Sequence, residues 1–261
     1  MPRNLKLTLS YDGHDFAGWQ IQPGRPTIQG TLASVFEHLT GEKTLPQGSG
    51  RTDAGVHALA QTASVAIQSP IPAANLARAL NDILPRSIRV LKAEEMPPDF
   101  HARKSAVAKT YQYRIFRGET CPPFLARYVY HHPYPLEEAR MIQAAALVEG
   151  EHDFTSFAAV DPERGRDGEE INNVRTIYRS EWKRQRAPAA WERQGEELLY
   201  TVRGNGFLHH MVRNLVGTFL MVGKGSLKIE DVRRILELRD RSAAAATAPA
   251  SGLFLVGVEY E

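Results

Sequence analysis

The chain has 261 residues, of which 43% are hydrophobic and 24% are charged, and its formal net charge is +2. These values are typical of a globular protein with a full core, in one large or two modest domains. The single cysteine, Cys121, excludes an internal disulfide and a cysteine-based zinc cluster. No apolar run approaches the roughly 20 residues that cross a bilayer. We therefore expect a cytoplasmic protein without membrane or secretory segments. A net charge of +2 does not by itself point to a polyanionic partner.

The N-terminal residues predict a strand followed by a helix. Apolar residues alternate from Leu5 to Tyr11, which is typical of a half-buried strand. Thr27 is a candidate N-cap, apolar residues at helical spacing follow it, and Gly41 is a natural stop. Trp19 lies in the loop between these elements, where we expect it to pack in the core; a contact with a base is the alternative that the family resemblance given below implies.

The stretch Gly48–Ala58, GSGRTDAGVHA, carries the charged residues Arg51 and Asp53 within a frame of small residues. Glycines at positions 48, 50 and 55 permit backbone angles that favour a sharply bent loop. The residues from Gln61 to Ile67 follow it as a predicted strand. The pattern alone fits either a plain turn in which Asp53 caps a backbone N–H or a loop that presents reactive groups.

A second helix and a third strand complete the first half. Pro70 and Pro72 precede apolar residues at helical spacing up to Leu84, and Ile88–Leu91 reads as a strand. The short basic passage Asp99–Lys104 follows, and we expect the N-terminal domain to cover residues 1–105. The charge pattern places Arg103 in a solvated linker, whereas the family resemblance given below implies a position near the active cleft.

The second half, residues 106–261, again alternates strands and helices. Tyr111 and Tyr113 alternate within a predicted strand, and a helix is expected from Leu136 to Val148. The charged stretch Ala159–Asn173 is predicted as a loop, in which Arg164 and Arg166 remain solvated or, as the family resemblance given below implies, touch RNA.

The last part of the chain is expected to hold a hairpin, two helices and a strand. A hairpin excursion is expected from Arg184 to Gly195. Phe207 and Met211 begin a helical apolar pattern that would include His209 and His210. A shorter helix, a low-complexity surface loop over Ala243–Pro249 and a final strand from Leu253 follow.

Four stretches together resemble the tRNA pseudouridine synthase A family. They are GSGRTDAGVHA, Lys109–Arg114, Gly206–Asn214 and Ala248–Leu253, and they occur in the order that the family has. The resemblance implies an α+β fold of two similar α/β halves, whose mainly antiparallel sheets meet at a central cleft with helices on the outer faces. It also implies a homodimer that isomerises uridines at positions 38 to 40 of the anticodon stem-loop of tRNA, without cofactor or metal.

The same resemblance assigns roles to individual residues. Asp53 is the expected nucleophile, and Tyr111 is expected beside the target base, where it stacks on uracil or carries a proton. Arg213 is expected to keep Asp53 ionised, with a helix-surface arginine as the alternative. Arg51 is expected either to fill the space of the extruded base or to hold a phosphate. Leu253 is expected as a pocket wall, with ordinary core as the alternative.

His57 stands four residues after Asp53, which suggests either acid–base chemistry or a hydrogen bond that fixes the loop. Two other functions remain open. A non-catalytic tRNA-binding chaperone would need the basic residues but not Asp53. A metal-dependent phosphodiesterase would combine Asp53 with His57, but the sequence offers no further ligands at suitable spacing.

Overall fold

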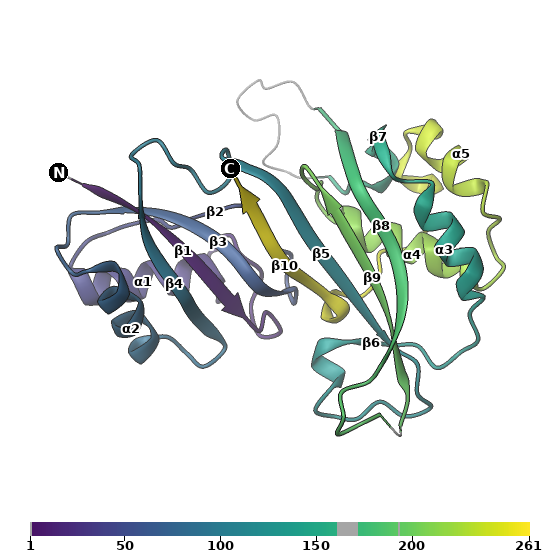
Figure 1. The fold of residues 1–261 in the computed structure, drawn as a ribbon, viewed down its shortest axis with the longest axis horizontal. Helices are drawn as coiled ribbons and strands as arrows, with labels where there is room; N and C mark the ends of the chain where they lie inside the picture. Colours follow the sequence, from purple (N-terminus) through teal and green to yellow (C-terminus); the bar gives the residue numbers. More distant parts are fainter. Residues whose placement is uncertain (1, 161–171, 193) are drawn as a thin grey trace. The chain divides into compact units, whose positions relative to one another are not determined.

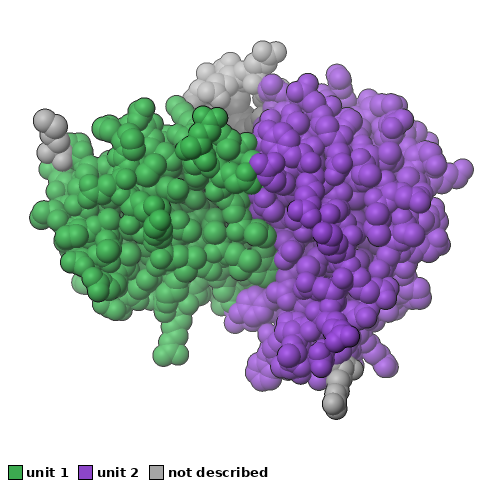
Figure 2. Space-filling view, in the orientation of Figure 1, with its two compact units in different colours: residues 1–109, 254–261 green, residues 110–253 purple. Residues whose placement is uncertain are grey.

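The computed structural model describes residues 2–160, 172–192 and 194–261 and contains two compact units (Figure 2). Unit 1 consists of residues 1–109 and 254–261, and unit 2 of residues 110–253. The predicted division at residue 105 differs from these ranges, because the chain enters unit 2 within one strand and its last strand returns to unit 1. Arg164 and Arg166 lie outside the described residues.

Unit 1 is built on strands β1 (Arg3–Tyr11), β3 (His57–Ile67), β4 (Ile88–Met96) and β10 (Leu253–Tyr260) except for its first residue, in the order β4-β1-β3-β10 (Figure 1). The short strand β2 (Gln47–Gly48) also pairs with β3. The pairs β1–β3 and β1–β4 are antiparallel, and β10 lies parallel to β3. The alternation predicted for β1 is confirmed, because its three leucines are fully buried.

Two helices pack side by side in unit 1, α1 (Ile28–Thr40) and α2 (Ala73–Ile83), and α2 lies against β4. The predicted ends of α1 are confirmed. The Thr27 hydroxyl accepts the Gly30 N–H at 3.2 Å, and Gly41 takes a φ of 73°, in the left-handed region that glycine tolerates.

Unit 2 has the strand order β5-β9-β8-β7, with the short β6 parallel to β5. The long antiparallel pair β8–β9 leaves a shorter connection than the excursion predicted for 184–195, since β8 continues to Arg186. Helix α3 packs against α4 and β8 (Figure 1). The elements are β5 (Ala106–Phe116), β6 (Tyr130–His131), β7 (Gly150–Asp153), β8 (Val174–Arg186), β9 (Glu196–Gly204), α3 (Glu138–Ala146), α4 (Met211–Gly223) and α5 (Asp231–Leu238).

The mainly antiparallel pairing, with helices packed on strands in each unit, confirms the predicted α+β class. Among the described residues, no helix combines the length and apolar character needed to span a bilayer.

The start of α4 differs from the prediction. The helix begins at Met211, so Phe207, His209 and His210 precede it. His210 has a φ of 59°, which is left-handed and therefore cannot continue a right-handed helix backward. Phe207 and Met211 are four residues apart, which is a helical spacing, but His210 between them is not helical.

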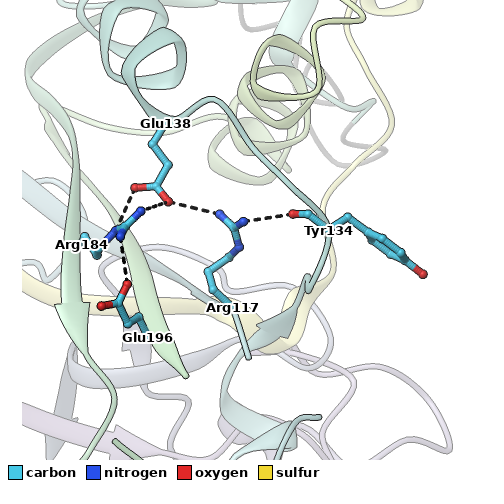
Figure 3. A network of polar contacts seen from close by, with 5 residues as sticks. All are labelled: Arg117, Tyr134, Glu138, Arg184 and Glu196. Carbon is cyan, nitrogen blue, oxygen red and sulfur yellow. Dashed lines mark hydrogen bonds and ion pairs between the residues drawn. The ribbon is translucent and has the colours of Figure 1, made fainter. Parts of the chain in front are cut away.

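A network of ion pairs joins α3 to the strands of unit 2 (Figure 3). Glu138, the first residue of α3, lies 3.3 Å from Arg117 Nη1 and 2.9 Å from Arg184 Nη2. Arg184 also lies 3.1 Å from Glu196 Oε2, and Arg117 donates to the Tyr134 carbonyl at 3.0 Å. The network therefore fixes the positive end of α3 against three separate parts of the chain.

Candidate active site

The loop that carries Asp53 runs between β2 and β3 of unit 1 and packs tightly on the loop before α1. Of the three glycines predicted to bend it, only Gly55 has a positive φ, at 78°. Gly48 serves another purpose, since a Cβ there would lie 2.6 Å from the Trp19 indole. Trp19 is 2% exposed, and its backbone N–H donates to the Thr52 carbonyl at 3.0 Å. Trp19 is therefore a core residue that supports the loop.

Three polar side chains, of which Ser49 and Gln61 are buried, hydrogen-bond the loop and hold it in place. Gln61 of β3 accepts the Ser49 hydroxyl at 2.6 Å and donates to the Gly50 carbonyl at 3.0 Å. Lys109 Nζ donates to the Ser49 carbonyl at 2.6 Å. Because these partners hold the backbone just before Arg51, the loop is preorganised rather than adaptable.

The same support continues between the two charged residues. The hydroxyls of Tyr11 and Thr52 lie 2.9 Å apart, and burial raises the pKa of Tyr11 to about 12, so the phenol stays neutral. Thr52 is buried, whereas Arg51 is exposed and Asp53 is half-buried. The sequence predictions missed Gln61 and Tyr11 as supports, although a glutamine inside an apolar strand is a signal for a buried hydrogen-bonding role.

Arg51 and Asp53 are each held by a neighbouring group. Arg51 Nε donates to Gln20 Oε1 at 3.0 Å, which ties the guanidinium to the loop that contains Trp19. The Asp53 carbonyl accepts the Val56 N–H at 3.1 Å, which closes the turn on which its carboxylate stands.

His57 is 1% exposed at the start of β3. Its Nδ1 accepts the Gly13 N–H at 3.1 Å and lies 3.1 Å from Asp12 Oδ1. Its ring stacks on Phe254 of β10, with centroids 4.7 Å apart. This enclosure fits the alternative in which His57 fixes the loop.

Arg103 follows a tightly held residue of unit 1. The Ala102 N–H donates to Ser64 Oγ at 3.1 Å, and the Ala102 carbonyl accepts the Tyr260 hydroxyl at 2.7 Å. The Arg103 side chain is exposed. Both sequence alternatives for Arg103, a solvated residue or a cleft residue, remain open.

Tyr111 and Tyr113 of β5 have different environments in unit 2. Tyr111 is 7% exposed, and its ring meets that of Phe207 edge-on at 5.0 Å. Tyr113 is fully buried and donates to the Pro249 carbonyl at 2.8 Å. Burial raises the pKa of Tyr113 far above its usual value, although the charge of Arg213 acts in the other direction. Tyr113 therefore packs in the core of unit 2.

Arg213 lies in the first turn of α4 and is half-buried. Its Nε donates to the Ala248 carbonyl at 2.8 Å, and the Ala248 N–H donates to the Arg213 carbonyl at 3.1 Å. Leu253, the first residue of β10, is 5% exposed. Arg213 is thus engaged with the segment that leads to Leu253, rather than being a plain helix-surface arginine.

Two groups of predicted site residues result. Unit 1 holds Arg51, Asp53, His57 and Arg103, and unit 2 holds Tyr111, Arg213 and Leu253. The supports described above hold the backbone of the Asp53 loop in unit 1 and the Arg213 side chain in unit 2. The pairing of Asp53 with Arg213 stays a prediction.

Comparison with known proteins agrees with these motifs. A family model described as tRNA pseudouridine synthase matches residues 8–103 and 144–261. A protein named tRNA pseudouridine synthase A from Solibacter usitatus is 52% identical over 99% of this chain and 100% of its own length. Proteins of the same name from Latilactobacillus sakei and Moorella thermoacetica are each 42% identical, over 100% and 98% of this chain and 100% and 99% of their own lengths.

Among solved structures, a chain of a Cbf5–Nop10–Gar1 complex aligns with 82% of this chain and 54% of its own length. The TM-score is 0.31 and the identity is 14%.

Proposed function

Because the chain belongs to the tRNA pseudouridine synthase A family, whose members are isomerases that form pseudouridine in tRNA, we propose a specific site and mechanism for it. The substrate is the anticodon stem-loop, at the uridines of positions 38 to 40. Asp53 is the nucleophile, and no cofactor takes part. The observation that carries the proposal is Asp53 itself, in the family motif, on a loop that buried polar groups hold in place.

The reaction is an internal exchange of one bond for another. The bond between uracil N1 and the sugar C1′ breaks, and a bond between uracil C5 and C1′ forms. C5 loses its proton and N1 gains one, so atoms and electrons balance without a donor, an oxidant or a metal. The protein has to supply a nucleophile or base, a fixed geometry and a pocket that separates the uracil from water.

Asp53 supplies the carboxylate in each version of the first step, whether it attacks the sugar, attacks the base or removes a sugar proton. Such a group acts only when it is ionised, and burial against RNA would favour its neutral form. Arg213 opposes this tendency by offering a guanidinium, whose planar fork suits a carboxylate.

The remaining residues hold the nucleotide. The target uridine has to leave its stack, at a cost of a few kcal/mol. Arg51, which is exposed next to the buried Thr52, either fills the vacated space or holds a phosphate. Tyr111 offers an aromatic face and Leu253 an apolar wall to the extruded uracil. Arg103 adds positive charge that attracts the phosphate backbone of the tRNA.

The alternative is a protein that binds or refolds tRNA without chemistry. It would need Arg51 and Arg103 but not a carboxylate at position 53. Membership in a family of isomerases favours the enzyme.

The proposal also includes a homodimer and a cytoplasmic location. Sedimentation of the purified protein, with and without tRNA, will test the homodimer, and fractionation of cells will test the location.

The test is pseudouridine mapping on unmodified tRNA transcripts, in one arm with a chelator and in a second arm with an added divalent metal. Wild type should convert uridines at positions 38 to 40, and Asp53→Asn should lose more than about 10³-fold in rate. Asp82→Asn, at an exposed aspartate of α2, is the matched control and should equal wild type. Binding without conversion by wild type supports the chaperone, and cleavage that requires metal supports the phosphodiesterase. Full turnover by Asp53→Asn overturns the assignment of the nucleophile.

A further inference from the structure

A low-complexity segment of unit 2 is bound along helix α4. We call residues 241–249 the strap. The Ala248 N–H donates to the Arg213 carbonyl at 3.1 Å, and the Ala245 N–H donates to Thr218 Oγ1 at 3.3 Å. The alanine-rich composition predicts only a surface loop, so these contacts give the segment a role that its sequence does not suggest.

Asn214 is the centre of this attachment. It is fully buried in α4, and its Oδ1 accepts the Thr247 hydroxyl at 2.7 Å and Arg241 Nη2 at 3.0 Å. Its Nδ2 donates to the Phe157 carbonyl at 2.7 Å. One side chain thus joins both ends of the strap to α4 and to a neighbouring turn, and the buried Asn214 amide needs these partners because water does not reach it.

Gly217 lets the strap approach the helix. A Cβ at this position would lie 2.0 Å from the Ala246 carbonyl oxygen, which is far inside van der Waals contact. Glycine is unfavourable within a helix, so its presence in the middle of α4 indicates a requirement for close approach. Any side chain at 217 has to push the strap away from α4.

The far end of the strap holds the Arg213 side chain. The Ala248 carbonyl accepts Arg213 Nε at 2.8 Å, and the next carbonyl, that of Pro249, accepts the Tyr113 hydroxyl at 2.8 Å. A hydrogen bond at Nε fixes the plane of the guanidinium. A carboxylate that pairs with such a fork tolerates little rotation, so the position of the strap sets the geometry of the pair.

We propose that Asn214, Gly217 and Thr247 are positioning residues for the isomerisation. They hold the strap on α4, and the strap's Ala248 carbonyl aims the Arg213 guanidinium at the nucleophilic carboxylate. This inference rests on the proposed function of Asp53 and Arg213. None of these three residues has to touch the substrate.

Two glycines of the same helix provide a matched test. Gly217→Ala moves the strap, whereas at Gly223 an added Cβ would meet the flexible Met141 side chain at 2.6 Å, away from the strap. Both changes replace a glycine of α4 with a better helix former. We expect Gly217→Ala to lower kcat on tRNA by about 10 to 10²-fold with little change in KM. The reason is that a small misplacement of a reacting group lowers the rate by that much. Gly223→Ala should stay within twofold of wild type.

A second variant keeps the proposal testable if Gly217→Ala fails to fold. Thr247→Val removes the hydroxyl that Asn214 accepts and should reduce kcat, whereas Thr247→Ser keeps the hydroxyl and should restore it. A double-mutant cycle adds a measurement that a purely structural role would not affect. In an Arg213→Lys background, which lacks the Nε–H, Gly217→Ala should cost clearly less than in wild type.

The outcomes separate the two proposals. If Asp53→Asn remains active, the proposed function fails. If Asp53→Asn is inactive but folded Gly217→Ala and Thr247→Val match wild type in kcat, only the positioning role is overturned. It is also overturned if kcat falls only in proportion to the unfolded fraction, or if the cycle shows full additivity.

Discussion

At residue 213, charge and geometry can be separated by substitution. Arg213→Lys keeps the positive charge but loses the donor to the Ala248 carbonyl, and Arg213→Ala loses both. We expect single-turnover rates to fall by about 10 to 10²-fold for lysine and by more for alanine. Alanine should also cost about 1 kcal/mol of unfolding free energy, from the lost hydrogen bond. Arg233→Ala, at an exposed arginine of α5, should alter neither the rate nor the melting temperature. Near-normal turnover by Arg213→Ala would contradict the pairing with Asp53.

The two roles open to His57 differ in their dependence on pH. Asparagine offers an oxygen close to the place of Nδ1, so His57→Asn retains an acceptor for the Gly13 N–H but cannot exchange a proton near neutral pH. We expect the variant to keep most of its activity and the shape of the wild-type pH–rate profile. His57→Leu, which offers no acceptor, should lose stability by about 1 to 3 kcal/mol because the buried N–H loses its partner. A profile that loses one limb in His57→Asn would restore the acid–base role.

The sequence indicates the proposed site residues of this chain more readily than the residues that hold them in place. Asp53, Tyr111 and Arg213 stand within motifs that a sequence displays directly. Gln61 and Asn214 do not, since their hydrogen bonds reach partners from distant parts of the chain. Their roles depend on which segments fold against them, and no local pattern specifies that.

At the scale of elements, the sequence predicts the end of a helix correctly where the residues next to that end determine it. The ends of α1 follow from the side chain of Thr27 and the φ of Gly41, both of which sequence anticipates. The start of α4 does not, because a left-handed histidine at 210 interrupts an apolar pattern that continues through it. Phe207 was therefore assigned to the helix, although its ring packs on Tyr111.

The first turn of α3 offers a test of the ion-pair network. Glu138→Gln removes the charge shared by Arg117 and Arg184, and burial already lowers the pKa of Arg117, so that cation depends on its partner. We expect a loss of about 1 to 3 kcal/mol in unfolding free energy, measured by urea denaturation at low salt. Glu137→Gln, at the more exposed neighbour that pairs with Arg140 at 3.6 Å, should cost less than about 0.5 kcal/mol. Equal effects of the two substitutions would contradict a structural role for the network.

The stability of the whole molecule should depend on pH through His132. This side chain is 2% exposed, no hydrogen bond reaches its Nε2 within the described chain, and burial together with nearby Lys224 and Arg117 lowers its pKa to about 4. An unfolded histidine titrates near 6.5. The unfolded state therefore binds the proton first, so this contribution to stability is complete above pH 6.5 and is lost as the pH falls toward 4.

His132→Phe should flatten that dependence, since phenylalanine fills the same space between Tyr130 and Tyr134 without a proton to bind. Melting temperatures of wild type and variant, measured from pH 4 to 8, give the comparison. The difference between the two should shift in favour of the variant as the pH falls. A constant difference across this range would remove His132 as the cause.

At the scale of the whole chain, the two units are the feature that sequence reasoning describes least well. The alternation of strands and helices predicts two halves divided once, near residue 105. The final strand instead pairs in parallel with β3, with Phe254 opposite His57. A parallel pairing across most of the chain length leaves no mark in local periodicity, because the strand has the same alternation wherever it binds.

This return predicts that unit 1 depends on the last residues of the chain. A chain ending at Leu253 loses Phe254 and Leu255, which are 6% and 0% exposed, and the bond from Tyr260 to the Ala102 carbonyl. Burial of two such apolar side chains contributes about 3 to 6 kcal/mol, a large part of the about 5 to 15 kcal/mol that stabilises a protein.

We therefore expect the truncated chain to lose amide protection first in β3, and with it the support of the Asp53 loop and pseudouridine formation, as measured by hydrogen exchange and tRNA mapping. A chain ending at Tyr260, which lacks only the exposed Glu261, should behave as the full protein. If the chain ending at Leu253 keeps wild-type protection in β3, unit 1 is complete without β10, and the parallel pairing contributes nothing to its stability.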